Sequence, residues 1–128
     1  MTRRAIQTSN APAAVASYSQ AIDTGGYVFC AGQIGLDPGT NEIVAGGVSA
    51  EADRALHNLI AVLDAAGLSM SDVVKTTCFL ADINDFGAFN GVYARFFPDP
   101  PPARSTFQVA ALPLGARVEV ELIAARSS

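Results

Sequence analysis

The clearest pattern in the chain is an apolar stripe at helical spacing between Gly47 and Gly67. Its members recur every three or four residues and are Val48, Ala52, Leu56, Leu59, Leu63 and Ala66. Such a stripe is typical of an amphipathic helix that packs on a sheet through one face. Ser49 is the expected N-cap, and Glu51 and Asp53 would lie in the first turn. Gly67 is the expected end of this helix.

A second helical pattern is built from aromatic residues. They lie three or four positions apart and are Phe86, Phe89, Tyr93 and Phe96. Pro98 disfavours helical backbone at the residue before it, so we expect the helix to end there. His57, the single histidine, falls at the margin of the first stripe and is expected on the surface.

Apolar and β-branched runs predict strands in the first two thirds of the chain. Residues 21–24 and 27–31 flank Gly25-Gly26, which can supply the positive φ angles of a tight hairpin turn. Residues 73–80 are apolar on both faces, which predicts a central strand covered from both sides. Residues 1–20 contain a proline and small polar side chains and are expected to form an extended arm or loop.

Two further strands are predicted near the end of the chain, at residues 104–109 and 118–124. Alternation gives the first strand a polar face and gives the second an acidic face opposite its aliphatic residues. These polar side chains are Arg104, Thr106 and Gln108 on the first strand, and Glu119 and Glu121 on the second. A loop containing proline and glycine joins the strands, so we expect a hairpin that places Arg104 near both acids.

The predicted order of elements is two or three strands, a helix, a strand, a helix and two strands. This order is typical of an α+β fold in which two helices pack on one face of a mixed sheet. The chain has 128 residues, half of them hydrophobic, which suits one domain spanning residues 1–128. Neither a membrane span nor a secretory signal is expected, because no apolar run is long enough and polar residues interrupt the start.

Charge and cysteine content exclude several function classes. The net charge of −4 and the single lysine, Lys75, argue against a nucleic-acid partner. Cys30 and Cys78 have no histidine or second cysteine at metal-ligand spacing, so we expect buried thiols, no metal and a reducing cytoplasm. The chain has no glycine-rich phosphate loop or cofactor-type lysine site, so no cofactor is expected.

Arg104 is the strongest candidate for binding a ligand. Three prolines and an alanine present it rigidly, and a guanidinium fork matches a carboxylate through two parallel hydrogen bonds. The alternative is a structural ion pair with Glu119 or Glu121. Each of these acids could instead orient a water and move protons, or simply be solvated. Tyr18 could donate a hydrogen bond from its phenol, or only pack.

Five sequence blocks resemble the Rid family of enamine/imine deaminases, the YjgF-like proteins. They follow the family order between about Asn10 and Ala124 and read NAPAAVASYSQAI, AGQIGLDPGT, LDAAGLSMSDVVKTTCFL, NDFGAFNGVYARFF and PPARSTFQVAALPLGARVEVELIA. The resemblance implies a chorismate-mutase-like fold and a homotrimer with three sites in clefts between subunits. It also implies cofactor-free hydrolysis of 2-imino acids, formed from enamines such as 2-aminoacrylate, to 2-keto acids and ammonium.

The same resemblance implies roles for single residues. Arg104 would bind the substrate carboxylate, Glu119 would position the attacking water, and Tyr18 would line the site. Gly32 would let its N–H approach the carboxylate, or would merely end a strand. The other residues expected at the pocket are Ala31, Phe86, Asn90 and Thr106, of which Phe86 fits core packing equally well and Asn90 fits a helix surface equally well.

Three positions depart from the family pattern. Ala31 replaces a serine, Thr106 replaces a cysteine, and Ser17 replaces the proline before the tyrosine. The missing hydroxyl at position 31 removes one ligand hydrogen bond, worth about 0.5–1.5 kcal/mol. These departures leave open a trimer that binds small carboxylates or regulates without turnover. A ribonuclease activity, also ascribed to relatives, is disfavoured by the acidic balance.

Overall fold

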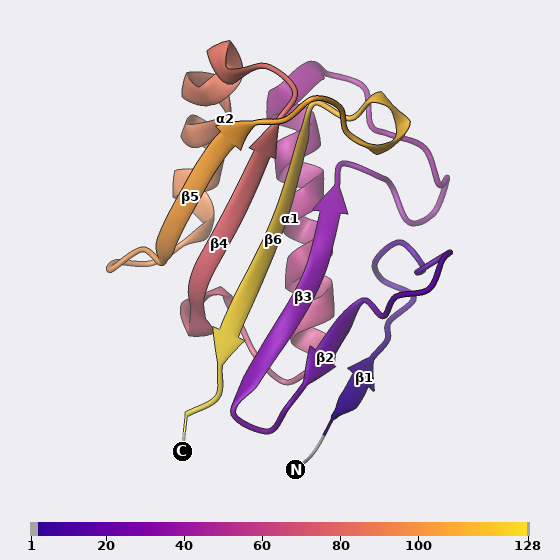
Figure 1. The fold of residues 1–128 in the computed structure, drawn as a ribbon, viewed down its shortest axis with the longest axis vertical. Coiled ribbons are helices and arrows are strands. Elements are labelled where there is room, and N and C mark those ends of the chain that lie inside the picture. Colours follow the sequence, from indigo (N-terminus) through magenta and orange to yellow (C-terminus); the bar gives the residue numbers. More distant parts are fainter. Residues whose placement is uncertain (1–2, 128) are drawn as a thin grey trace.

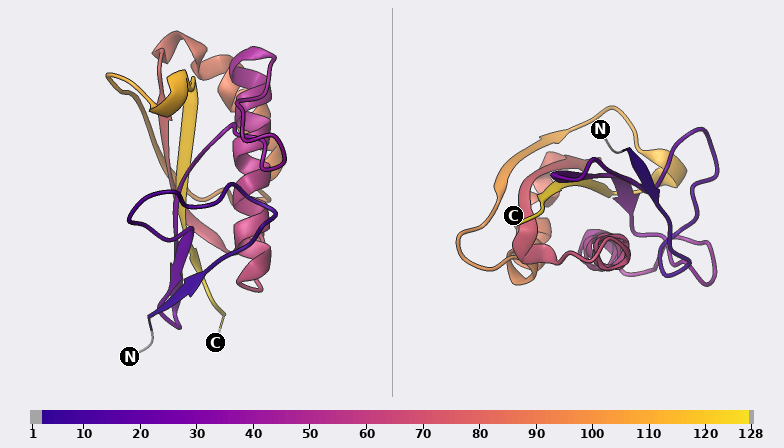
Figure 2. Two further views of the ribbon diagram at one scale, coloured as in Figure 1. Left: turned by 90° about the vertical axis from the view of Figure 1, so that its right-hand side faces the viewer. Right: turned by 90° about the horizontal axis from the view of Figure 1, so that it is seen from below.

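A mixed sheet forms one layer of the structure and two helices form the other (Figures 1 and 2). The computed structural model describes residues 3–127. Its strands are β1 (Arg4–Ile6), β2 (Ala21–Asp23), β3 (Tyr27–Ile34), β4 (Val73–Leu80), β5 (Ala103–Gln108) and β6 (Val118–Ala125), and its helices are α1 (Gly47–Ala65) and α2 (Phe86–Tyr93). The strand order is β1-β2-β3-β6-β4-β5, and β4 and β5 are the parallel pair. The α+β architecture predicted from the sequence is confirmed.

Helix α1 buries the predicted apolar stripe against the sheet. Leu56, Leu59 and Leu63 are completely buried, and the helix ends before Gly67, whose φ is 77°. The predicted start was wrong. Gly46 is the N-cap and the helix begins at Gly47. Both glycines have positive φ, which only glycine adopts readily, so they turn the chain into the helix before Ser49 is reached. The two expected acids, Glu51 and Asp53, therefore lie beyond the first turn.

Alternate residues of β6 complete the core. Four aliphatic side chains face the helices and are almost inaccessible: Val118, Val120, Leu122 and Ala124. Cys30 and Cys78 lie in the same core as free thiols, as predicted. Burial raises the pKa of Cys30 to about 12 and that of Cys78 to about 11, so both thiols stay protonated at neutral pH.

The predicted hairpin between the last two strands was wrong. Strand β5 pairs with one edge of β4, and β6 pairs antiparallel with the other edge. Figure 1 shows β4 lying between them. The loop that carries the short 3₁₀ turn Pro113–Gly115 therefore joins strands that are not neighbours. Within one chain, β4 is also covered on one face only, because Lys75, Thr77 and Phe79 on its other face remain partly exposed.

The sheet face away from the helices remains open (Figure 2). It exposes the aromatic side chains of Tyr27, Phe29 and Phe107, which are 50%, 45% and 44% accessible. Phe107 meets Phe79 edge to face across β5 and β4, with their ring centroids 5.3 Å apart. This face is thus an apolar surface that nothing in residues 3–127 covers. Neither helix in that range is long and apolar enough to cross a membrane.

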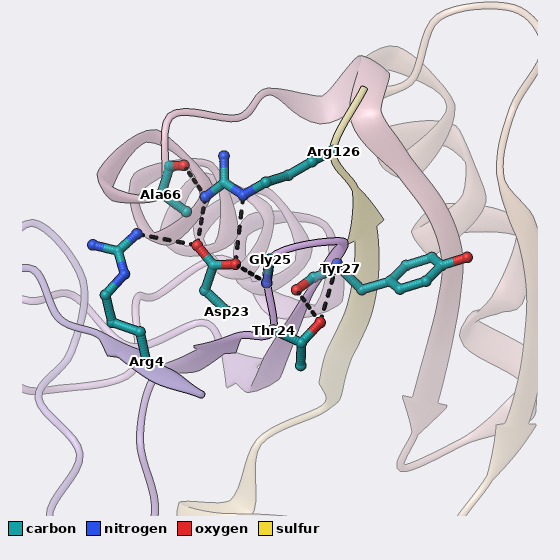
Figure 3. Close-up of polar contacts among 7 residues, drawn as sticks. All are labelled: Arg4, Asp23, Thr24, Gly25, Tyr27, Ala66 and Arg126. Atoms are coloured by element: carbon teal, nitrogen blue, oxygen red, sulfur yellow. Dashed lines mark hydrogen bonds and ion pairs between the residues drawn. The ribbon is translucent and has the colours of Figure 1, made fainter. Parts of the chain in front are cut away.

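The buried carboxylate of Asp23 in β2 links β1 to the residue that follows β6 (Figure 3). Asp23 is 4% exposed and accepts hydrogen bonds from Arg126 at 2.6 Å, Arg4 at 3.0 Å and the Gly25 N–H at 2.8 Å. Arg126 also donates to the Ala66 carbonyl at the end of α1. The hydrogen bond from Arg126, followed by those from Gly25 and Arg4, holds the pKa of Asp23 well below its usual range. Strand β1, which the sequence did not reveal within the expected arm, is held here.

Replacing Asp23 by asparagine should lower the thermal midpoint at neutral pH by several degrees, because the amide loses the charge that both guanidinium groups bind. The folded pKa is depressed, so the stabilisation is present above the usual aspartate pKa of about 3.9 and disappears as the pH falls further. Melting curves of parent and variant should therefore converge in acid. Asp64→Asn, at an exposed acid of α1, is the control. A difference of equal size at both ends of the pH series would contradict this explanation.

Candidate active site

A β-bulge in β3 shapes the first half of the candidate site. Cys30 pairs with Leu122 and Gln33 pairs with Val120, so two residues of β3 lie opposite one residue of β6. The two residues are Ala31 and Gly32, in the AGQ block. Bulges of this kind bend a strand and redirect its backbone. Here the bend opens a place for a side chain from β6.

That side chain is Glu119. A Cβ atom at position 32 would overlap the Glu119 carboxylate oxygen Oε2 and would lie 2.8 Å from its carboxyl carbon. A side chain at position 32 would therefore displace the Glu119 carboxylate from its present place, a role of Gly32 that the sequence did not suggest. Burial, followed by the negative charge of Glu121, raises the pKa of Glu119. A half-buried acid with a raised pKa accepts and returns a proton more readily than an ordinary exposed carboxylate.

A cleft of about 600 Å³ opens beside Glu119. It brings together four of the predicted site residues, which are Tyr18, Ala31, Gly32 and Glu119. The rest of its wall is mainly apolar and includes Pro12, Val15, Ile34, Leu36, Pro113 and Leu114. Tyr18 is 51% exposed, so its side chain lines the cleft and does not pack in the core. Ala31 contributes only a methyl group here.

Gln20 holds the irregular segment that carries Tyr18. Its side chain is buried, accepts a hydrogen bond from the Thr8 N–H at 2.7 Å and donates to the Pro12 carbonyl at 2.8 Å. The backbone carbonyl of Gln20 accepts a hydrogen bond from the Ala31 N–H at 3.0 Å. Gln20 therefore connects one wall of the cleft to the bulge. Sequence reasoning missed this residue, although a lone glutamine beside an apolar strand was an available signal.

Arg104 forms a second, separate half of the site. Its Nη1 donates to Asn90 Oδ1 at 2.8 Å, and its guanidinium carbon lies 4.5 Å from the Tyr93 ring centroid and 5.3 Å from that of Phe86. These contacts come from α2, on the helical side of the sheet. Within residues 3–127 Arg104 forms no ion pair. The alternative of a structural ion pair with Glu119 is therefore wrong for the single chain.

A second cavity, of about 510 Å³, adjoins Arg104 and is also lined by Asn90, Tyr93 and Phe97. Phe86 lies against the Arg104 guanidinium group, is 36% exposed and is not a core residue. Thr106 shares the helical side with Arg104, and its hydroxyl is buried without a hydrogen-bond partner in the described part of the chain. That hydroxyl is a donor left unused within the subunit.

The two halves do not meet within one chain. Register pairs Arg104 with Thr76 and pairs Glu119 with Phe79, three residues further along β4. Residues three apart in a strand point to opposite faces, so Arg104 and Glu119 lie on opposite sides of the sheet. His57, exposed as predicted, belongs to neither half. In residues 3–127 no three His, Cys, Asp or Glu side chains are grouped to hold a metal ion.

The sequence and fold can be compared with known proteins. A family model described as Endoribonuclease L-PSP matches residues 8–126. A 2-iminobutanoate/2-iminopropanoate deaminase from Rattus norvegicus is 52% identical over 122 residues, which cover 95% of this chain and 89% of the relative.

Solved structures agree with the family match. E. coli TdcF with bound serine superimposes with a TM-score of 0.92 and is 44% identical, over 97% of this chain and 99% of that one. The E. coli YjgF gene product also gives 0.92, at 43% identity and the same coverage. The fold expected from the sequence blocks is therefore confirmed, and the chain belongs to the Rid, or YjgF-like, family.

Proposed function

We propose that this protein hydrolyses 2-imino acids to 2-keto acids and ammonium. The substrates are 2-iminopropanoate, which forms from 2-aminoacrylate, and its homologue 2-iminobutanoate. The observation that carries the proposal is Glu119, a half-buried acid with a raised pKa held against Gly32 beside a cleft of about 600 Å³. The similarity to the rat deaminase, at 52% identity, supports the same reaction.

The reaction needs a positioned water and a group that moves protons. The substrate enters as the protonated imine, and Glu119 accepts a proton from the water as its oxygen attacks the imine carbon, which gives a carbon bearing both hydroxyl and amino groups. Glu119 then returns that proton to the nitrogen, the C–N bond breaks, and the departing ammonia takes up the hydroxyl proton as the keto group forms. One protonated imino acid and one water thus yield one keto acid and one ammonium ion. Holding water and substrate together supplies most of the acceleration.

Arg104 is the proposed anchor for the substrate carboxylate. A guanidinium group has five N–H donors, and the hydrogen bond to Asn90 uses one of its terminal nitrogens. The other terminal nitrogen and Nε are suited to a bidentate contact with a carboxylate. Tyr18 and the backbone at Gly32 line the opposite wall in this arrangement, and Phe86, Asn90 and Thr106 surround the arginine.

We propose that the active species is a homotrimer whose sites lie between subunits. Two observations support this. The open sheet face exposes Tyr27, Phe29 and Phe107, more apolar surface than a soluble monomer normally leaves uncovered. Arg104 and Glu119 also lie on opposite sides of one sheet, and Arg104 lies on the edge strand β5. A neighbouring subunit can therefore bring its Arg104 to the cleft that holds Glu119.

Two other functions make different demands on the chain. A trimer that binds carboxylates without turnover would need Arg104 but not Glu119, and the departures at Ala31, Thr106 and Ser17 are the features that leave it open. Endoribonuclease activity, which the description of the family model names, would require binding to phosphates. The net charge of −4 and the single lysine disfavour that activity.

Glu119→Gln should lower kcat by about 100-fold or more, because the amide cannot accept a proton, while binding of a keto acid changes little. Glu121→Gln should keep kcat near that of the parent. It should also move the acid limb of the kcat profile to lower pH, since removing the nearby negative charge lowers the pKa of Glu119.

The assay generates 2-aminoacrylate with a serine or threonine dehydratase and follows formation of the 2-keto acid. A parent protein that accelerates no imino acid from several amino-acid precursors would refute the proposed reaction. Equal losses in the two glutamine variants, or a limb that moves to higher pH, would refute the choice of Glu119.

Arg104→Ala and Arg104→Lys should each weaken pyruvate binding by about tenfold or more, because lysine keeps the charge but loses the bidentate fork. Calorimetric titration with pyruvate and 2-oxobutanoate measures this loss. Both variants must keep the parent's mass in solution and melt near the parent temperature. Parent-like affinity in either folded variant would make Arg104 a structural residue only.

Two variants that are each impaired should regain activity when they are refolded together and assayed at a substrate concentration below KM. A site that takes Arg104 from a Glu119→Gln subunit and Glu119 from an Arg104→Ala subunit has both groups intact. Random mixing in trimers gives about one quarter of the sites this composition, so about a quarter of parent activity should return. Light scattering should give three times 13.2 kDa, and each variant refolded alone is the control. Trimers without restored activity would contradict the site between subunits.

A further inference from the structure

Tyr93 packs face-on against the guanidinium group of Arg104. The guanidinium carbon lies 4.5 Å from the ring centroid, well within the range of a cation–π contact. Tyr93 is 4% exposed, whereas Phe86, the other ring in contact with Arg104, is 36% exposed and 5.3 Å away. A buried ring interacts with a cation through less screening water, so the contact with Tyr93 is the stronger of the two.

The Tyr93 ring is itself held in place at both ends. Its hydroxyl shares a hydrogen bond of 2.7 Å with Thr76 Oγ1, and both residues are buried. Its ring packs against those of Phe89 and Phe97, with centroids 5.5 Å and 4.5 Å away. The ring therefore has one position available to it.

Thr76 also lies directly opposite Arg104 in the pairing of β4 with β5. Arg104, Tyr93 and Thr76 are therefore each in contact with the other two. Arg104 pairs with Thr76 through the strands, its guanidinium group packs on the Tyr93 ring, and the Tyr93 hydroxyl hydrogen-bonds to Thr76. Asn90 accepts a hydrogen bond from one terminal nitrogen of the guanidinium group. An arginine in solution has many rotamers, and this arrangement restricts both the plane of the guanidinium group and its rotation in that plane.

From this geometry we propose that Tyr93, fixed by Thr76, is a positioning residue of the reaction. It holds the guanidinium plane of Arg104 at the angle at which the free N–H donors meet the substrate carboxylate. The inference rests on the proposed function, in which Arg104 is the carboxylate anchor. The aromatic spacing predicted only that Tyr93 lies on the second helix, and core packing alone does not require a ring at this place.

Three variants separate positioning from packing. Tyr93→Leu removes the ring, Tyr93→Phe keeps the ring and loses the hydroxyl, and Leu59→Ala is the control. Leu59 is a completely buried residue of α1, and the rings and hydrogen bonds that hold Tyr93 and Arg104 do not include it. Both Tyr93→Leu and Leu59→Ala remove buried volume, so both should melt below the parent.

Tyr93→Leu should weaken pyruvate binding about fivefold or more and raise KM for the imino acid by a similar factor. The value of kcat should fall less, because Glu119 still activates the water. Tyr93→Phe keeps the ring, so its affinity should stay within about twofold of the parent, and folded Leu59→Ala should keep parent affinity. Parent-like affinity in Tyr93→Leu, or an equal loss in Leu59→Ala, would overturn the inference. If Tyr93→Leu does not fold, Tyr93→Met replaces it, since the unbranched, flexible side chain of methionine fills an irregular space more readily than leucine.

A double-mutant cycle then shows whether Tyr93 acts through Arg104. In an Arg104→Ala background, Tyr93→Leu should cause no further loss of pyruvate affinity, whereas independent effects would add. Additive losses would overturn the inference. If Arg104→Ala binds pyruvate as the parent does, the proposed anchor fails whatever the tyrosine variants do. If Arg104→Ala loses binding and folded Tyr93→Leu keeps it, the proposed function stands and only the role of Tyr93 fails.

Discussion

The structure depends first on the burial of the α1 stripe against the sheet. Each completely buried leucine of the stripe, such as Leu56 or Leu59, contributes about 1.5–3 kcal/mol through loss of its contact with water. The partner surface is formed by β3 and β6, and the β6 residues Val118 and Val120 belong to this buried core. Because strand residues alternate, this packing forces the residue between them, Glu119, onto the opposite face. The position of the acid is thus a consequence of how the core is built.

The same alternation separates Glu119 from Arg104. On β5 the Arg104 side chain points toward α2, where it contacts the Asn90 amide and the rings of Phe86 and Tyr93. On β6 the Glu119 side chain points toward the open face of the sheet. A single subunit therefore carries both halves of a site without assembling one. Self-association accomplishes two things in the proposed trimer, because it covers apolar surface and brings an arginine to an acid.

Local features of the fold could be read from the sequence, and pairings between distant strands could not. The stripe of α1, the glycine that ends it and the Gly25-Gly26 turn each depend on neighbours within a few residues, and each was predicted correctly. The hairpin of β5 and β6 was wrong because β4, more than twenty residues earlier, inserts between them. The cap at Ser49 was wrong because alternation of residue types carries no information on the φ angles that Gly46 and Gly47 adopt.

The candidate site divides in the same way. Residues named from the family blocks, such as Tyr18 and Gly32, line one cleft, but their partners in contact were missed. Gln20 hydrogen-bonds to the Pro12 carbonyl, and Tyr93 contacts Thr76 and Arg104. These partners are at least eight positions away in the sequence, so no spacing rule reveals them.

The contact between Gly32 and Glu119 also constrains how this chain can evolve. A methyl group at position 32 has no room while the carboxylate occupies its present place. A shorter residue at position 119 would free that space, so the order of the two substitutions matters. Once alanine stands at position 32, a glutamate restored at position 119 cannot return its carboxylate to the present place. The present placement of the acid is therefore easily lost and is regained only after the glycine has returned.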